Sequence, residues 1–134
     1  MKRNDRDLYD YSVWPDFTKE ELVCQHTGEE NPNVEAFTQL IDGLQELRDW
    51  YGKPIIVTSA YRSPKHPIEA RKTNPGQHSI AAVDIQVPTE DCHKIVAKAF
   101  EMGYTGIGIN LKGSKKSRFI HLDERRTAPR VWSY

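Results

Sequence analysis

The sequence has little cysteine, no net charge and no long apolar run, and each absence excludes a class of protein. Its only cysteines, Cys24 and Cys92, lie far apart, so they are typical of free core thiols in a reducing compartment and not of a disulfide framework. Lysine plus arginine and aspartate plus glutamate both number 19, which leaves no excess charge to favour nucleic acid or an acidic membrane face. No apolar stretch approaches the roughly 20 residues of a membrane span.

The first 16 residues are polar and aromatic, and we expect this N-terminal segment to be irregular. It begins with charged residues and lacks the apolar stretch of a secretory signal. We therefore expect a protein that is made in the cytoplasm without a signal peptide. The remaining residues, 17–134, are expected to form a single domain, since domains commonly contain about 100–200 residues.

Hydrophobic spacing predicts a long helix followed by several strands. Apolar residues recur at steps of three or four between Val34 and Leu47, which indicates a helix that ends near Tyr51, before the stop signals Gly52 and Pro54. A second helix is expected from Thr89 to the residue before Gly103. Strands are expected at residues 54–59, 83–87, 106–110 and 118–123. This order is typical of the α+β class.

Polar side chains interrupt two of the predicted strands. Asp84 lies among Ala, Val and Ile, His78 precedes that strand, and His121 occupies a similar apolar setting in the last strand. A buried carboxylate is costly unless it is compensated, and two histidines with one carboxylate can hold a catalytic zinc with an open position for water. Nickel or cobalt suits the same ligands. The alternative is that the histidines are hydrogen-bonded residues of the core or surface.

Four motifs resemble the zinc D-Ala-D-Ala carboxypeptidase family. They follow one another at residues 59–66 (SAYRSPKH), 76–85 (GQHSIAAVDI), 106–108 (GIG) and 119–123 (FIHLD). The family includes the L-alanyl-D-glutamate endopeptidases of phage lysins, and the hedgehog signalling domain shares its fold. The resemblance covers roughly residues 17–134 and is closest to short phage or prophage members. It implies a small antiparallel sheet with helices packed on one side.

The resemblance also assigns residues to the site. It implies that the zinc ligands are His78, Asp84 and His121, and that Arg62 binds substrate and polarises its carbonyl. This sequence departs from the family at three points. Gly76 replaces a serine, the first two ligands are six residues apart instead of seven with no glycine between them, and Arg118 stands where relatives carry an acidic general base.

Because Arg118 cannot act as a base, Asp123 is our candidate for that role. Asp123 shares a strand face with His121; the alternatives are that it orients a ligand imidazole, that it forms an ion pair with a neighbouring arginine, or that Glu69 of the long loop at residues 60–77 is the base. Arg62 is expected to bind a substrate carboxylate or the oxyanion, or to form a loop salt bridge. His66 is expected to contact substrate or to stabilise the loop.

We therefore expect a hydrolase of the metallopeptidase type, with Zn²⁺ as its cofactor. Its expected substrate is the peptide of peptidoglycan, cut by a carboxypeptidase or by an endolysin-like endopeptidase, with neither nucleic acid nor membrane as partner. It would act on the bacterial cell wall after release or as part of a phage particle. The alternative is a non-catalytic metal-binding or peptidoglycan-binding module. The oligomeric state is left open.

Overall fold

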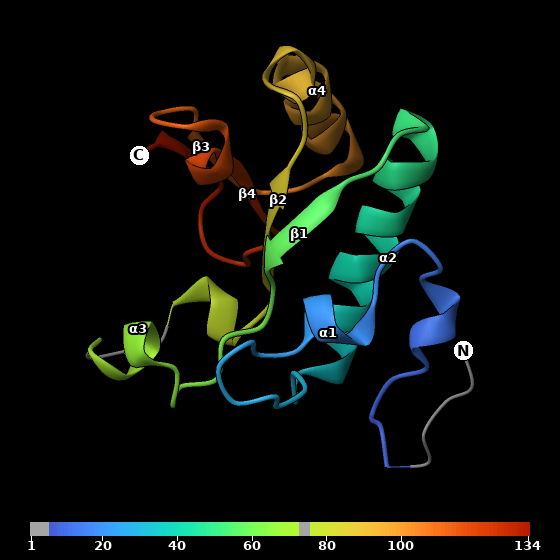
Figure 1. Cartoon of the computed structure of the whole chain (residues 1–134), viewed down its shortest axis with the longest axis vertical. Coiled ribbons are helices and arrows are strands. Elements are labelled where there is room, and N and C mark those ends of the chain that lie inside the picture. The colour runs from blue at the N-terminus through green and yellow to red at the C-terminus, as the bar shows by residue number, and fades with distance from the viewer. Residues whose placement is uncertain (1–5, 73–75) are drawn as a thin grey trace.

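The computed structural model describes residues 6–72 and 76–134 (Figure 1). The first five residues of the predicted N-terminal segment and residues 73–75 of the predicted long loop lie outside this part. The helices are α1 (Lys19–Leu22), α2 (Val34–Tyr51), α3 (Pro67–Ala70) and α4 (Cys92–Met102), with 3-10 turns η1 (Tyr11–Val13), η2 (Gln77–Ser79), η3 (Thr89–Asp91) and η4 (Lys115–Ser117). The strands are β1 (Ile56–Ser59), β2 (Ala82–Gln86), β3 (Gly106–Asn110), β4 (Phe119–Asp123) and β5 (Arg130–Ser133).

The long helix α2 has the bounds that its apolar stripe predicts. It ends at Gly52, which adopts the left-handed conformation with φ of 74°, as glycine does without steric cost. Asn33 precedes the helix but makes no side-chain cap. Its amide instead donates to the carbonyls of Ser79 and Ile80, so this residue ties the start of α2 to the loop before β2.

A five-stranded sheet with the order β1-β2-β4-β3-β5 forms the centre of the molecule. The pairs β1–β2, β2–β4 and β4–β3 are antiparallel, which agrees with the expected α+β class. The last pair differs from the expected antiparallel sheet, because β5 runs parallel to β3. After β4 the chain returns to the end of the sheet at which β3 begins, and β5 then forms the edge strand next to β3.

The two faces of the sheet have different chemistry. One face and the buried sides of α2 and α4 form a single apolar core, to which the sheet contributes Val57, Val83, Ile85, Ile107, Ile120 and Leu122. Full burial of a side chain of this size contributes about 1.5–3 kcal/mol. Side chains alternate along a strand, so the residues between these, including Asp84 and His121, project from the opposite face. The core therefore fixes the strands that carry the polar residues.

Residues before the predicted domain boundary also belong to the core. Tyr9, Tyr11 and Trp14 are buried in the same apolar cluster as α2, and the Trp14 indole donates to Asp42 of that helix at 2.8 Å. The two cysteines are free and buried, as expected. Within the described residues, no helix has the length and apolar character that crossing a membrane requires.

Candidate metal centre

Asp84 and His121 lie opposite each other on neighbouring strands. Asp84 of β2 is paired with His121 of β4 in the antiparallel register. Directly opposite residues project to the same face with Cβ atoms about 4.5–5.5 Å apart. Both side chains are buried. The strand pairing therefore brings together two of the three predicted ligands.

His78 reaches the same point from η2. Its backbone carbonyl accepts from Arg62 N at 2.8 Å, and its Nδ1 lies 2.8 Å from the carbonyl oxygen of Ala60. A carbonyl oxygen only accepts hydrogen bonds, so His78 Nδ1 carries a proton and donates. These bonds hold the loop against the end of β1. They place His78 beside Asp84 although the two residues are only six positions apart in the sequence.

The three side chains converge on one point. His78 Nε2 lies 3.2 Å from Asp84 Oδ1, and His121 Nδ1 lies 3.1 Å from the same oxygen and 3.2 Å from His78 Nε2. One ligand atom from each residue lies within 4.8 Å of the other two. No other group of three histidine, cysteine or acidic side chains in the described ranges has such an arrangement.

The chemistry of these atoms fits a cation. His78 donates to Ala60 through Nδ1, and His121 Nε2 lies 2.7 Å from the carboxylate of Asp123. In their neutral forms both rings then direct a lone pair at Asp84, whose carboxylate also offers only lone pairs. Three acceptors this close repel one another unless a proton or a metal cation lies between them. Two imidazoles and a carboxylate suit zinc and neighbouring divalent metals.

Electrostatics keep the acidic ligand ionised. Burial by itself raises the pKa of Asp84, but hydrogen bonds from His121 and His78 in their protonated, metal-free forms outweigh burial and hold that pKa well below its usual range. Arg62 adds positive charge, with Nη2 3.6 Å from Asp84 Oδ2. Asp84 is therefore a carboxylate at neutral pH, in the form that binds a metal.

Asp123 lies behind His121, on the side of the ring away from Asp84. Its Oδ2 accepts from His121 Nε2 and also lies 2.7 Å from Arg125 Nη2, while Oδ1 accepts from Arg125 Nε at 2.9 Å. Burial raises the pKa of Asp123, but these bonds outweigh burial and lower it. The side chain is fully buried. This geometry favours the orienting role over the role of general base.

Arg62 and Glu69 belong to one charged network in the loop after β1. Arg62 Nη1 lies 3.4 Å from Glu69 Oε2, and the Glu69 carboxylate also accepts from Gly76 N at 2.7 Å and Lys72 Nζ at 3.1 Å. Burial raises the pKa of Glu69, but Gly76 and Lys72 outweigh it and lower that pKa. Glu69 thus holds the loop and orients Arg62, which favours this role over the role of base.

The remaining predicted residues lie to the side of the ligands. His66 precedes α3 and accepts from Ile68 N through Nδ1 at 3.1 Å, a contact that stabilises the loop. Arg118 donates to Gly113 O and to Thr89 Oγ1, so it points away from the ligands, as strand alternation predicts. The site therefore contains no side chain from the position at which relatives place the base.

A cavity of about 310 Å³ opens over the ligands. Arg62 and an aromatic wall line it. The ring centroids of Trp132 and His121 lie 5.1 Å apart, and those of Phe119 and Tyr134 lie 4.9 Å apart. The sequence motifs assign no site role to Trp132 and Tyr134. Tyr134 directly follows β5 and lies two residues after Trp132, a spacing at which side chains of an extended chain share one face. Lys72, Gln77 and Arg125, which also line the cavity, carried no such signal.

Glycines of β3 make room for this arrangement. A Cβ added at Gly108 would lie 2.6 Å from the Trp132 indole, and one at Gly106 would lie 2.1 Å from Asp123 Oδ1. Both distances are too short for any side chain. The two glycines of the GIG motif therefore leave the space that the Trp132 and Asp123 side chains occupy.

Comparison with known proteins supports a peptidase. A sequence model of the family described as Peptidase M15 matches residues 15–123, which is most of the chain and includes all three candidate ligands. No curated protein and no solved structure gives a match. Peptidases of this family depend on a metal, and the His–Asp–His cluster gives this chain a place to bind one. The chain therefore belongs to the peptidase M15 family of zinc D-Ala-D-Ala carboxypeptidase-like proteins.

Proposed function

We propose that the protein is a zinc peptidase that hydrolyses peptide bonds in the stem peptides of peptidoglycan. The observation that carries this proposal is the convergence of His78, Asp84 and His121 beneath an open cavity. Membership of the peptidase family supports the reaction type. The peptidoglycan substrate rests on the resemblance of the four motifs to wall-cleaving relatives.

The residues of the site have different proposed roles. His78, Asp84 and His121 would hold the metal, which when bound polarises the scissile carbonyl and lowers the pKa of a water to about 7. Arg62 presents a planar guanidinium at the cavity, which suits a substrate carboxylate or a developing oxyanion. The guanidinium also contacts Glu69, so it is held in position before substrate binds.

Tyr134 is a further donor for the reaction. Its side chain lines the cavity, and burial raises the pKa of its hydroxyl. The hydroxyl therefore keeps its proton at neutral pH and can donate to negative charge that develops on the substrate. Lys72 offers a second donor at the same wall.

One observation favours the alternative, a non-catalytic binding module. Among the described residues that line the cavity, Asp84 is the only acid, and it is a candidate ligand. Arg118 has replaced the expected acid and points elsewhere. A module of this kind would bind zinc and peptidoglycan peptides without cutting them.

Purified peptidoglycan separates the two functions. A peptidase releases new amino groups from it, loses this activity with a chelator, and regains it with added zinc. The His121→Ala variant should be inactive under all conditions. Mass analysis of the fragments then identifies the bond, D-Ala-D-Ala or L-Ala-D-Glu. Full zinc occupancy with no release of amino groups would support the binding module instead.

The site of action is also part of the proposal. We place it at the bacterial cell wall, after release from the cell or within a phage particle, because the motifs are most similar to those of short phage and prophage members. The balanced charge of the chain gives no support for nucleic acid as a partner.

A further inference from the structure

A second and larger cavity lies beside the metal cavity. It encloses about 620 Å³ between the first turns of α2, the loop before β2 and the segment after β4. Two residues, Gln77 and Arg125, line both cavities. The two cavities are therefore neighbours that share a wall. A ligand that is too long for the metal cavity can extend into the second one.

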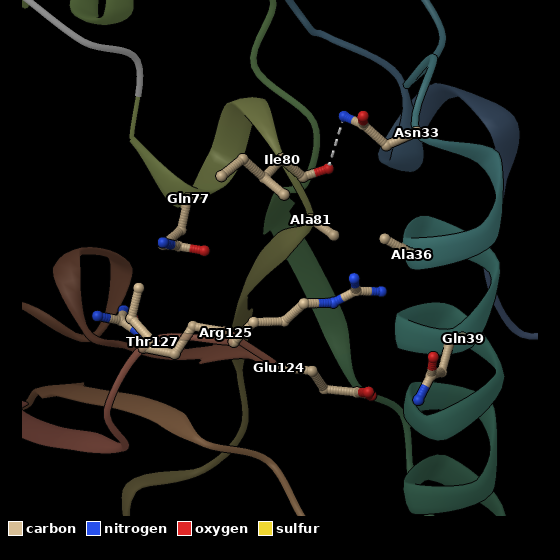
Figure 2. A pocket seen from close by; sticks show the side chains of 10 residues that line it. Asn33, Ala36, Gln39, Gln77, Ile80, Ala81, Glu124, Arg125 and Thr127 are labelled. Atoms are coloured by element: carbon tan, nitrogen blue, oxygen red, sulfur yellow. Dashed lines mark hydrogen bonds between the residues drawn. The ribbon is translucent and has the colours of Figure 1, made fainter.

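The walls of this second cavity present unused polar groups. Figure 2 shows Gln77 on one side and Gln39 on α2 on the other. The side chains of Gln39, Gln77 and Arg126 make no hydrogen bond with the part of the chain that the structure describes. An amide side chain offers both donors and an acceptor, which matches a peptide backbone, and a guanidinium matches a carboxylate.

Small residues keep the cavity open. Ala36 directs its methyl group from α2 toward Ala81 (Figure 2). The carbonyl of Ile80 in the same wall accepts from Asn33 Nδ2 at 3.2 Å, so the loop and the helix are fixed relative to each other. The space between them is thus a built feature of the fold, lined by both polar and apolar side chains.

We infer that this second cavity is a subsite for the uncleaved part of an extended, carboxylate-bearing peptide substrate. The inference rests on the proposed function, because it takes the metal cavity as the place of cleavage. Substrate held across Gln77 and Arg125 contacts both spaces at once. The protein therefore prefers a stem peptide of several residues to a dipeptide.

A bulky substitution that fills the cavity tests this inference. Ala36→Trp places an indole in the space, while Glu35→Trp, at the neighbouring exposed position, is the matched control. With zinc-loaded protein, Ala36→Trp should raise KM for a stem pentapeptide about tenfold, equivalent to about 1.4 kcal/mol, with kcat and dipeptide cleavage unchanged. Glu35→Trp should leave KM for the pentapeptide and cleavage of the dipeptide unchanged. An unchanged KM for the pentapeptide in Ala36→Trp would overturn the inference.

Binding measurements keep this test separate from catalysis. If zinc-loaded protein cuts neither peptide, the proposed peptidase activity fails, and the same peptides are titrated calorimetrically against the same three proteins. The subsite then predicts that the pentapeptide binds about tenfold more tightly than the dipeptide, and that Ala36→Trp alone removes the difference. Equal affinity of the unsubstituted protein for both peptides would contradict the subsite.

The charge of the subsite is tested with Arg126→Gln. This change removes the cation and leaves a hydrogen-bonding group of similar reach. It should weaken binding of a pentapeptide with free carboxylates severalfold and should not affect its fully amidated form. Equal weakening of both forms, or of neither, would contradict the carboxylate-binding role of Arg126.

Discussion

The Asp123 carboxylate accepts a hydrogen bond from His121 Nε2 at 2.7 Å, on the side of the ring away from the candidate metal position. This bond fixes the tautomer of His121 so that Nδ1 presents a lone pair to the site. Arg125 holds the same carboxylate through two further bonds. A chain of three residues thus sets the orientation of one ligand.

Asp123→Asn tests this orienting role. The substitution keeps the shape but removes the charge that favours the His121 tautomer, so zinc affinity should fall about 10–100-fold. Zinc competition with a chelating dye measures this directly. If Asp123 is instead the general base, kcat falls and zinc affinity stays unchanged. The two roles are therefore distinguished by one pair of measurements.

Arg118→Ala should have little effect on catalysis. Its guanidinium contacts Gly113 O and Thr89 Oγ1, so its loss should cost about 0.5–1.5 kcal/mol of stability per hydrogen bond and leave kcat/KM on peptidoglycan peptides within about twofold, less than 1 kcal/mol. Arg62→Ala is the matched comparison, and its kcat/KM on the same peptides should fall about 100-fold or more. A large loss of activity in Arg118→Ala with normal stability would contradict this assignment.

Stabilisation by zinc should increase with pH. Burial alone lowers the pKa of His121, but hydrogen bonds to Asp123 and Asp84 outweigh burial and raise it. In metal-free protein the protonated ring thus stabilises the fold fully below about pH 6.5, and this contribution is lost as pH rises through the raised pKa. Zinc must displace the proton, so the increase in Tm on adding zinc should be larger at about pH 8 than at about pH 6.

The exposed histidine His93 supplies the control for that experiment. It does not line the cavity over the ligands, so His93→Gln should show the same pH dependence as the unsubstituted protein. An increase in Tm that is identical at both pH values, measured by thermal unfolding, would mean that no ligand proton is displaced.

Gly108→Ala should disturb the wall of the site and not only the stability of the fold. The added Cβ would meet the Trp132 indole at 2.6 Å, and overpacking of this kind costs about 1–3 kcal/mol. Trp132 packs against the His121 ring, so tryptophan fluorescence and peptide hydrolysis should change together. Ile107 is one residue along the strand and faces the core. Ile107→Val should lower the stability of the fold by about 0.5–1.5 kcal/mol and should change neither tryptophan fluorescence nor peptide hydrolysis.

The helices, the strands and the candidate ligands could be predicted from the sequence because each carries a local signal. The apolar stripe of α2 stops at Tyr51, before Gly52, and Asp84 and His121 are polar residues at alternating positions within apolar strands. Strand alternation is also consistent with Arg118, whose guanidinium points away from the candidate ligands. These features depend on the period of the helix or strand alone.

The contacts of the site were harder to predict because they depend on partners distant in sequence. Alternation placed Asp123 on the face of His121, but the carboxylate lies behind the ring because Gly106 leaves room there and Arg125 holds it. The parallel pairing of β5 with β3 brings Trp132 over Gly108. No local pattern specifies which strand a C-terminal segment will join.

The central claim is that His78, Asp84 and His121 together bind one zinc ion. Measurement of bound zinc per chain after dialysis, in the unsubstituted protein and in single alanine variants of the three residues, tests it most directly. The account predicts one equivalent in the unsubstituted protein and loss of tight binding in each variant that remains folded. Absence of zinc from the folded, unsubstituted protein, or full occupancy in His121→Ala, would contradict it.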